Sequence, residues 1–218
     1  MIQINKGSEP KELTLYRTTT PNPTYKGFQN KEILLAYLLK EQGFLCAYCM
    51  GRMSEERASI EHFEAQNPLS ETENQVKTNN SDFEYYNLLA VCREEGLPKK
   101  LQHCDVFRGN KKLYFNPSNQ LISVESLVTY SNDGTIKHNG DLSMDKQLVN
   151  LNLNVPILKN NRAKAKTEFF NMLKPTDYKK SVLNKILKKY IEKSEGKLSP
   201  YVGIILYFLK RKIASLPN

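Results

Sequence analysis

The sequence predicts an α+β protein, with short strands around a metal-binding core and helices in the C-terminal third. Its four cysteines could together bind one tetrahedral metal ion. Short apolar segments separated by polar stretches are typical of strands, whereas the chain after about residue 141 follows the period of amphipathic helices. These observations favour a mixed fold stabilised by a metal.

The chain of 218 residues can form one ordinary domain or two small ones, and 39% of its residues are hydrophobic. Its most apolar stretch, residues 201–210, is shorter than the roughly 20 residues of a membrane span. The first residues lack the apolar segment of a signal peptide. We therefore expect a cytoplasmic protein with no membrane partner.

The formal net charge of +9 is unevenly distributed along the chain. Residues 1–145 contain 16 basic and 19 acidic side chains, whereas residues 146–218 contain 16 basic and only 4 acidic ones. A concentration of positive charge indicates a polyanionic partner, most often nucleic acid. The solvated faces of amphipathic helices would give the same pattern, so charge alone leaves both interpretations open.

Residues 1–29 contain three prolines and are predicted to form an extended arm (Pro10, Pro21 and Pro23). The next segment, residues 30–43, has a helical pattern with Asn30 as its cap and Gly43 at its end. Its predicted apolar face comprises Ile33, Leu34, Tyr37 and Leu38.

The middle of the chain predicts strands joined by polar loops. Residues 58–63 and 83–92 are the apolar segments, 64–82 and 93–103 are polar loops, 104–112 can form a short helix, and 121–138 can form a hairpin that turns at 132–134.

Helices are predicted for the rest of the chain. Their expected starts are Asp145, Asn154 with Pro156, Thr176, and Ser199 with Pro200 at the first helical position. The resulting division is an arm (1–29), a metal-bearing domain (30–140) and a basic helical region (141–218).

The cysteines predict a structural zinc site. Cys46 and Cys49 form a Cys-x-x-Cys knuckle, and Cys92 and Cys104 can form a second pair if the residues between them loop out. Buried free thiols or a redox pair are the alternatives, but a thioredoxin-like motif requires a βαβ frame that is missing around this one. His103 could replace Cys92 or Cys104 as a ligand.

The order of motifs around these cysteines resembles the zinc-bearing HNH, or ββα-metal, nucleases. Those enzymes contain a Cys-x-x-Cys knuckle, an acidic residue and His on a strand, Asn in a loop, and a second cysteine pair followed by His, Asn or Asp. The corresponding segments are "CAYC", "IEHF", "YYNLLAVC" and "HCD". The resemblance implies a zinc-stabilised ββα-metal core with an N-terminal arm and helix.

The resemblance also implies roles for individual residues. His62 would be the general base that takes a proton from water, and Asn87 would help to align it. Glu61 and Asp105 offer the oxygen ligands that suit Mg²⁺ or Mn²⁺. Cationic contacts with phosphate are expected from Arg108, Lys111 and Lys112.

Residues 1–115 and the hairpin resemble, more closely, the HNH protein of Septu anti-phage systems (PtuB) and the HNH proteins beside some retrons. This resemblance implies a nuclease, with DNA as the expected substrate, that an ABC-type ATPase (PtuA-like) controls. The retron versions also involve a reverse transcriptase and its RNA–DNA hybrid. An RNase, for example one directed at tRNA, and a non-catalytic zinc-binding module are the alternatives.

Overall fold

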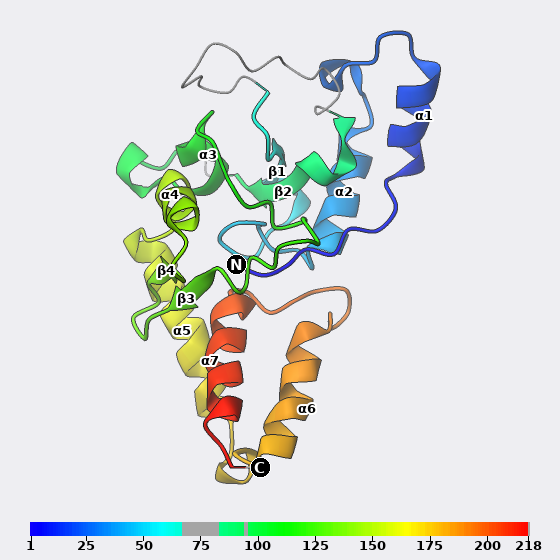
Figure 1. Cartoon of the computed structure of the whole chain (residues 1–218). Helices are drawn as coiled ribbons and strands as arrows, with labels where there is room; N and C mark the ends of the chain where they lie inside the picture. The colour runs from blue at the N-terminus through cyan, green and yellow to red at the C-terminus, as the bar shows by residue number, and fades with distance from the viewer. Residues whose placement is uncertain (67–82, 94–95, 218) are drawn as a thin grey trace.

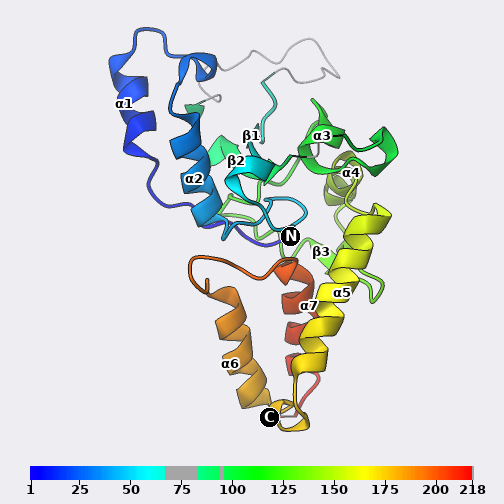
Figure 2. The ribbon, with the colours of Figure 1, turned by 180° about the vertical axis from the view of Figure 1, so that it is seen from behind.

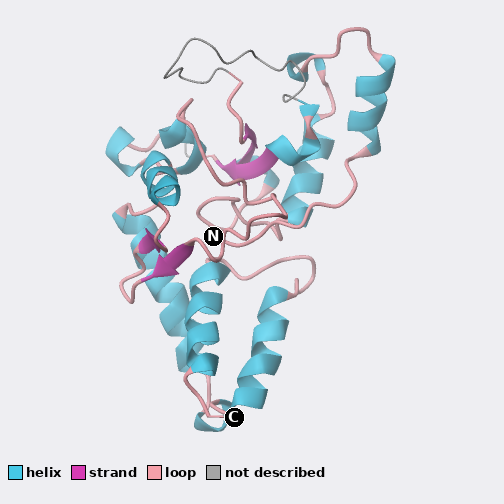
Figure 3. Cartoon of the chain, in the orientation of Figure 1, coloured by secondary structure: helices cyan, strands magenta, loops and turns pink. Residues whose placement is uncertain are grey.

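The structure, a computed structural model, describes residues 1–66, 83–93 and 96–217. Helices surround two small antiparallel sheets with the orders β1-β2 and β3-β4 (Figures 1 and 3). The predicted mixture of helices and short strands is therefore confirmed. The elements are α1 (Lys11–Thr19), α2 (Lys31–Glu41), β1 (Ala58–His62), β2 (Leu88–Cys92), α3 (Cys104–Arg108), β3 (Val128–Tyr130), β4 (Ile136–His138), α4 (Leu142–Asn150), α5 (Pro156–Met172), α6 (Lys180–Ile191) and α7 (Val202–Ala214).

The hairpin of β1 and β2 is the centre of the N-terminal half. Its register pairs Ala58 with Cys92 at one end and His62 with Leu88 at the other. The first four residues of β2 are buried because helices lie on both sides of this strand, α2 on one and α3 on the other (Figures 1 and 2). The two strands and α3 together form a ββα unit.

The prediction of an extended arm over residues 1–29 is wrong for residues 11–19, which form α1. Pro10 directly precedes this helix, where its fixed φ and missing N–H are tolerated. Leu13 is the fully buried residue of α1. The prolines therefore border the helix instead of excluding one.

The helix predicted over residues 30–43 is confirmed as α2, but its buried face differs from the expected one. Leu34, Leu38 and Leu39 are buried, whereas Ile33 and Tyr37 are exposed. Asn30 precedes the helix as expected but forms no side-chain cap hydrogen bond. The face toward the hairpin is therefore rotated by about one residue.

Helices α5, α6 and α7 form a bundle that extends away from the hairpin (Figures 1 and 2). Three of the predicted starts shift. Asp141, not Asp145, caps α4 by accepting from the Met144 N–H at 2.9 Å. Helix α6 begins at Lys180, and α7 begins after Tyr201, whose φ of 55° is left-handed. In the part of the chain that the structure describes, no helix combines the length and apolarity needed to cross a bilayer.

The bundle is anchored to the turn that carries the first two cysteines. The Leu198 N–H donates to the Gly43 carbonyl at 3.1 Å, and the Tyr201 N–H donates to the Met50 carbonyl at 2.9 Å. A Cβ atom on Gly203 would lie 2.7 Å from the Met50 sulfur, so only glycine allows this approach. The division at residue 140 stays a prediction, and these contacts join its two sides.

Candidate functional site

Four cysteine sulfurs from three segments of the chain gather at one end of the hairpin. The ligand atoms of Cys46, Cys49, Cys92 and Cys104 all lie within 4.8 Å of one another. The Sγ atoms of Cys46 and Cys104 are 3.7 Å apart, and those of Cys49 and Cys92 are 3.9 Å apart. A tetrahedron with Zn–S bonds of about 2.3 Å has S–S edges of about 3.8 Å. The donor set therefore fits a structural zinc ion.

Backbone hydrogen bonds of the knuckle and of β2 help to hold these sulfurs in place. The knuckle turn closes through the Cys46 N–H to the Gly51 carbonyl at 3.0 Å, and the Ala47 N–H donates to the Ala90 carbonyl of β2 at 3.1 Å. The Gly51 N–H lies 3.3 Å from the Cys49 sulfur. Cys104 is the first residue of α3, so the fourth sulfur fixes this short helix against the hairpin.

His103, the alternative ligand, lies beside the cysteine cluster. Its Nδ1 is 3.2 Å from the Cys104 sulfur and 3.9 Å from the Cys92 sulfur. Burial lowers the pKa of His103, which favours the neutral ring. Four thiols already complete a tetrahedral set, so this geometry favours His103 as a hydrogen-bond partner of the sulfurs.

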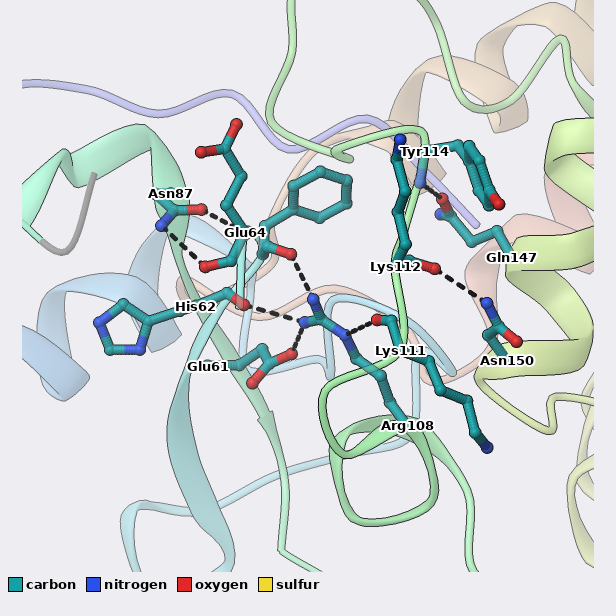
Figure 4. A network of polar contacts seen from close by, with 11 residues as sticks. Glu61, His62, Glu64, Asn87, Arg108, Lys111, Lys112, Tyr114, Gln147 and Asn150 are labelled. Atoms are coloured by element: carbon teal, nitrogen blue, oxygen red, sulfur yellow. Dashed lines mark hydrogen bonds and ion pairs between the residues drawn. The ribbon is translucent and has the colours of Figure 1, made fainter. Parts of the chain in front are cut away.

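Glu61 and Arg108 form a buried ion pair in the middle of the ββα unit (Figure 4). The Arg108 guanidinium also donates to the carbonyls of His62, at 2.9 Å, and Phe63. Its Nε donates to the Lys111 carbonyl at 2.9 Å. One side chain of α3 thus fixes the end of β1.

This placement of Arg108 disagrees with the expectation from the sequence that Arg108 contacts phosphate. The side chain is only 1% exposed, and three acceptors of the hairpin occupy its two terminal nitrogens. Lys111 and Lys112 reach away from the His62 ring (Figure 4). Their ammonium groups lie over neighbouring aromatic rings, 4.0 Å from the Phe107 centroid and 5.5 Å from the Tyr114 centroid.

Glu61 and Asp105 interact. Burial and a hydrogen bond with Asp105 together raise the pKa of Glu61 to about 8, although Arg108 opposes the rise. Two adjacent carboxyl groups that repel each other's negative charge are typical of a site that a divalent cation would stabilise.

The Tyr48 hydroxyl is a second feature of the region around Glu61 and Asp105 that suits a bound cation. It is buried and has no hydrogen-bond partner among the residues that the structure describes. Burial raises the pKa of Tyr48, and the charges of Glu61 and Asp105 raise it further, which places the three groups in one neighbourhood. Two carboxylates and an unsatisfied hydroxyl fit one Mg²⁺ or Mn²⁺ ion that keeps several of its waters.

The His62 ring lies on the other side of β1 from the Glu61 carboxylate (Figure 4). Successive side chains of a strand point to opposite faces, so the Glu-His pair is separated by the strand itself. His62 is 8% exposed, and its ring contacts that of Tyr25, with centroids 4.4 Å apart and planes at 87°. No sequence motif indicates a role for Tyr25, which lies 37 positions before His62.

Asn87 lies beside the end of β1 and binds the backbone of Glu64. Its Oδ1 accepts from the Glu64 N–H at 2.7 Å, and its Nδ2 donates to the Glu64 carbonyl at 3.4 Å. The Phe63 N–H also donates to the Asn87 carbonyl at 2.8 Å. These three bonds hold the residues that follow His62, so any alignment of His62 by these bonds acts through the main chain.

Comparison with known proteins agrees with this arrangement. The chain is 33% identical over 101 residues to a protein of Escherichia coli named "Retron Ec83 putative HNH endonuclease". The aligned segment covers 42% of the chain and 37% of that relative, so the chain spans less than two fifths of the relative's length. No protein-family model matches the chain. The likeness supports a nuclease of the HNH type.

Proposed function

We propose that this protein is a metal-dependent HNH endonuclease that hydrolyses phosphodiester bonds, with DNA as its substrate. The observation that carries the proposal is the gathering of four thiols around the hairpin that presents Glu61 and His62. This clamp places Asp105 of α3 beside Glu61 and Asn87 beside the residues after His62. The similarity to the retron protein supports the same reaction class.

The residues divide the chemistry between them. Glu61 and Asp105 would hold one Mg²⁺ or Mn²⁺ ion, which when bound would neutralise charge on the scissile phosphate. His62 would accept the proton of the attacking water, because a neutral imidazole titrates near physiological pH. Asn87 and Arg108 keep the end of β1 in position for both roles.

Because β1 separates the His62 ring from the Glu61 carboxylate, these two groups do not face each other in the free protein (Figure 4). Catalytic contacts in a free enzyme are often loose and tighten only in the substrate complex. Binding of the phosphodiester would have to bring the scissile phosphate across the end of β1, between the carboxylates and the His62 ring, without turning the ring. The low exposure of His62 means that the same step must also open the site.

The proposal extends to biological context. Residues 1–115 and the hairpin resemble the Septu HNH proteins, and the aligned relative is named as a retron protein. We therefore propose that the chain is the effector of an anti-phage complex that an ABC-type ATPase regulates, with a reverse transcriptase as a further partner if the system is a retron. Sequencing of the neighbouring reading frames, and co-purification of the chain with any ABC-type ATPase found there, test this assignment.

The activity is tested on supercoiled plasmid with Mg²⁺ or Mn²⁺, alone and with the ATPase. Wild type and His138→Ala, a control at the end of β4, should nick the plasmid, and His62→Ala should be slower by about 10²- to 10⁴-fold. Equal nicking by wild type and His62→Ala would remove His62 from catalysis. Cleavage of matched RNA alone would reassign the substrate. Zinc binding with no cleavage under any of these conditions would leave only the binding-module alternative.

A further inference from the structure

The N-terminal segment brings an aromatic ring to the proposed general base. Tyr25 lies in the 3₁₀ turn Tyr25–Gly27, between α1 and α2, and contacts the His62 ring edge-to-face at a centroid distance of 4.4 Å. On the strand side, Arg108 binds the His62 carbonyl and Asn87 binds the Glu64 N–H, so these two bonds act on the main chain around His62. Tyr25 is thus placed to orient the ring itself.

A network of contacts fixes Tyr25 from the side away from His62. The Tyr16 hydroxyl of α1 donates to the Thr24 carbonyl at 3.2 Å, and the Thr24 hydroxyl accepts from the Gly27 N–H at 3.2 Å. A Cβ atom on Gly27 would lie 2.5 Å from the Tyr16 hydroxyl oxygen, so glycine allows the turn to close against Tyr16. The turn that carries Tyr25 is therefore specified by its sequence.

Aromatic packing then joins this turn to the hairpin. The centroid of the Tyr16 ring lies 5.4 Å from that of Phe28 and 5.8 Å from that of Phe83. The centroids of the Tyr25 and Phe83 rings are 6.4 Å apart. The Arg17 guanidinium donates to the Phe83 carbonyl at 3.2 Å. The Lys31 ammonium also lies over the Tyr25 ring, 5.0 Å from its centroid. Tyr25 thus contacts His62 from a surface that is itself packed and hydrogen-bonded.

We infer that Tyr25 is a positioning residue that sets the orientation of the His62 ring, and that the N-terminal segment therefore forms part of the active site. The inference rests on the proposed function for its catalytic meaning, but the ring contact can be measured without any activity. Edge-to-face geometry is a preferred arrangement of aromatic pairs, so removing one ring leaves the other with fewer orientational constraints. A general base must be correctly placed before its pKa matters.

Three substitutions separate positioning from simple stability. Tyr25→Leu removes the ring, and Tyr25→Phe keeps it. Leu13→Ala is the control for stability, because it removes a fully buried apolar side chain of the same N-terminal segment and leaves every ring of the aromatic cluster in place. Thermal unfolding and zinc content show whether each variant remains folded.

The kinetic readout is plasmid nicking by the full chain, with the ATPase if it is required. Tyr25→Leu should lower kcat by about tenfold to a hundredfold, with KM changed less than threefold, because a misplaced catalytic group costs rate and not binding. Tyr25→Phe should restore most of kcat. Leu13→Ala should keep kcat at temperatures where it is folded. A kcat for Tyr25→Leu equal to that of Leu13→Ala would overturn the inference.

The structural readout is proton NMR of the His62 ring, which is tractable because the chain contains three histidines. His62→Ala identifies the resonances. Nuclear Overhauser contacts should join the His62 and Tyr25 rings in wild type, and the Tyr25 ring current should displace the His62 resonances in wild type and Tyr25→Phe but not in Tyr25→Leu. Absence of these contacts from folded wild type would overturn the inference even if the protein cleaves DNA. Their presence in a protein that cleaves nothing would uphold the contact and reject the proposed function.

Discussion

Arg108 of α3 binds the carboxylate of Glu61 on β1, 47 positions earlier in the chain, and both side chains are buried. The same guanidinium donates to the His62 carbonyl at 2.9 Å. A basic residue expected to contact phosphate is thus an internal link between the strand and the helix. The first prediction follows from this link.

Replacement of Arg108 should destabilise the protein strongly. Arg108→Met leaves Glu61 and three carbonyls without their donor, and removing one partner of a buried ion pair costs about 3–5 kcal/mol. The matched control is Lys111→Met, which removes one bond to the Phe107 carbonyl and should cost well under half of that. Urea unfolding measures both. A loss below about 1 kcal/mol for Arg108→Met would contradict a structural role.

Zinc should be bound by sulfur alone. Purified wild type and His103→Gln should each contain one zinc ion per chain, because four thiols complete the tetrahedral set. Cys46→Ser should lose the ion and the cooperative unfolding of the hairpin region, since the binding energy of the metal is part of the folding energy. Elemental analysis and circular dichroism check this. Full zinc content in Cys46→Ser, or none in His103→Gln, would reassign the ligands.

Asn87 should matter to both stability and rate. In Asn87→Ala the partly buried Glu64 N–H loses its acceptor, which costs about 0.5–1.5 kcal/mol. The residues after His62 then loosen, and kcat should fall by up to about a hundredfold. Asn87→Asp keeps an acceptor for that N–H and should retain more stability than the alanine variant. Thermal unfolding and plasmid nicking measure the two effects. Equal losses for both substitutions would show that the acceptor is not the important group.

Lys6 should make stability depend on pH. Burial lowers the pKa of Lys6 from 10.5 to about 7, although Glu41 opposes the shift. Between these values the unfolded chain binds the extra proton, so the stability of wild type relative to Lys6→Met should rise with pH, by up to about 1.4 kcal/mol per unit. Below pH 7 the difference should be constant, because both states are protonated.

Unfolding in urea at pH 6, 7 and 9 measures the pH effect. Lys11→Met, at an exposed position of α1, is the control and should show no change with pH relative to wild type. A difference between wild type and Lys6→Met that is equal at pH 7 and pH 9 would show that Lys6 stays protonated in the folded protein. Its bonds to the Tyr85 and Leu88 carbonyls would then outweigh the cost of burial.

The sequence predicted those parts of the site that depend on residue type and order. The two cysteine pairs, the strand that ends in Glu61 and His62, and the helix that begins at Cys104 are all where the motifs place them. These features are local, or are fixed by a metal that accepts only certain ligands at certain distances.

Features that depend on tertiary contacts could not be predicted in this way. Arg108 carries no local sign that its partner would be Glu61, and Tyr25 meets His62 only because α1 and its turn pack onto the hairpin. The sequence does not predict α1, because prolines on both sides of a segment indicate extended chain. Pro10 nevertheless occupies a position that helices tolerate. Which face of α2 is buried likewise depends on its packing partners.

The cysteine cluster also affects the order in which the site can assemble during synthesis. Cys46 and Cys104, whose sulfurs lie 3.7 Å apart, are 58 positions apart in the chain. When Glu61 and His62 have emerged from the ribosome but Cys104 has not, the nascent chain lacks the fourth zinc ligand. It also lacks Asp105 and Arg108. In the proposed nuclease, no working centre would form until α3 has emerged from the ribosome, which would delay any cleavage of nearby nucleic acid until the later segments can fold.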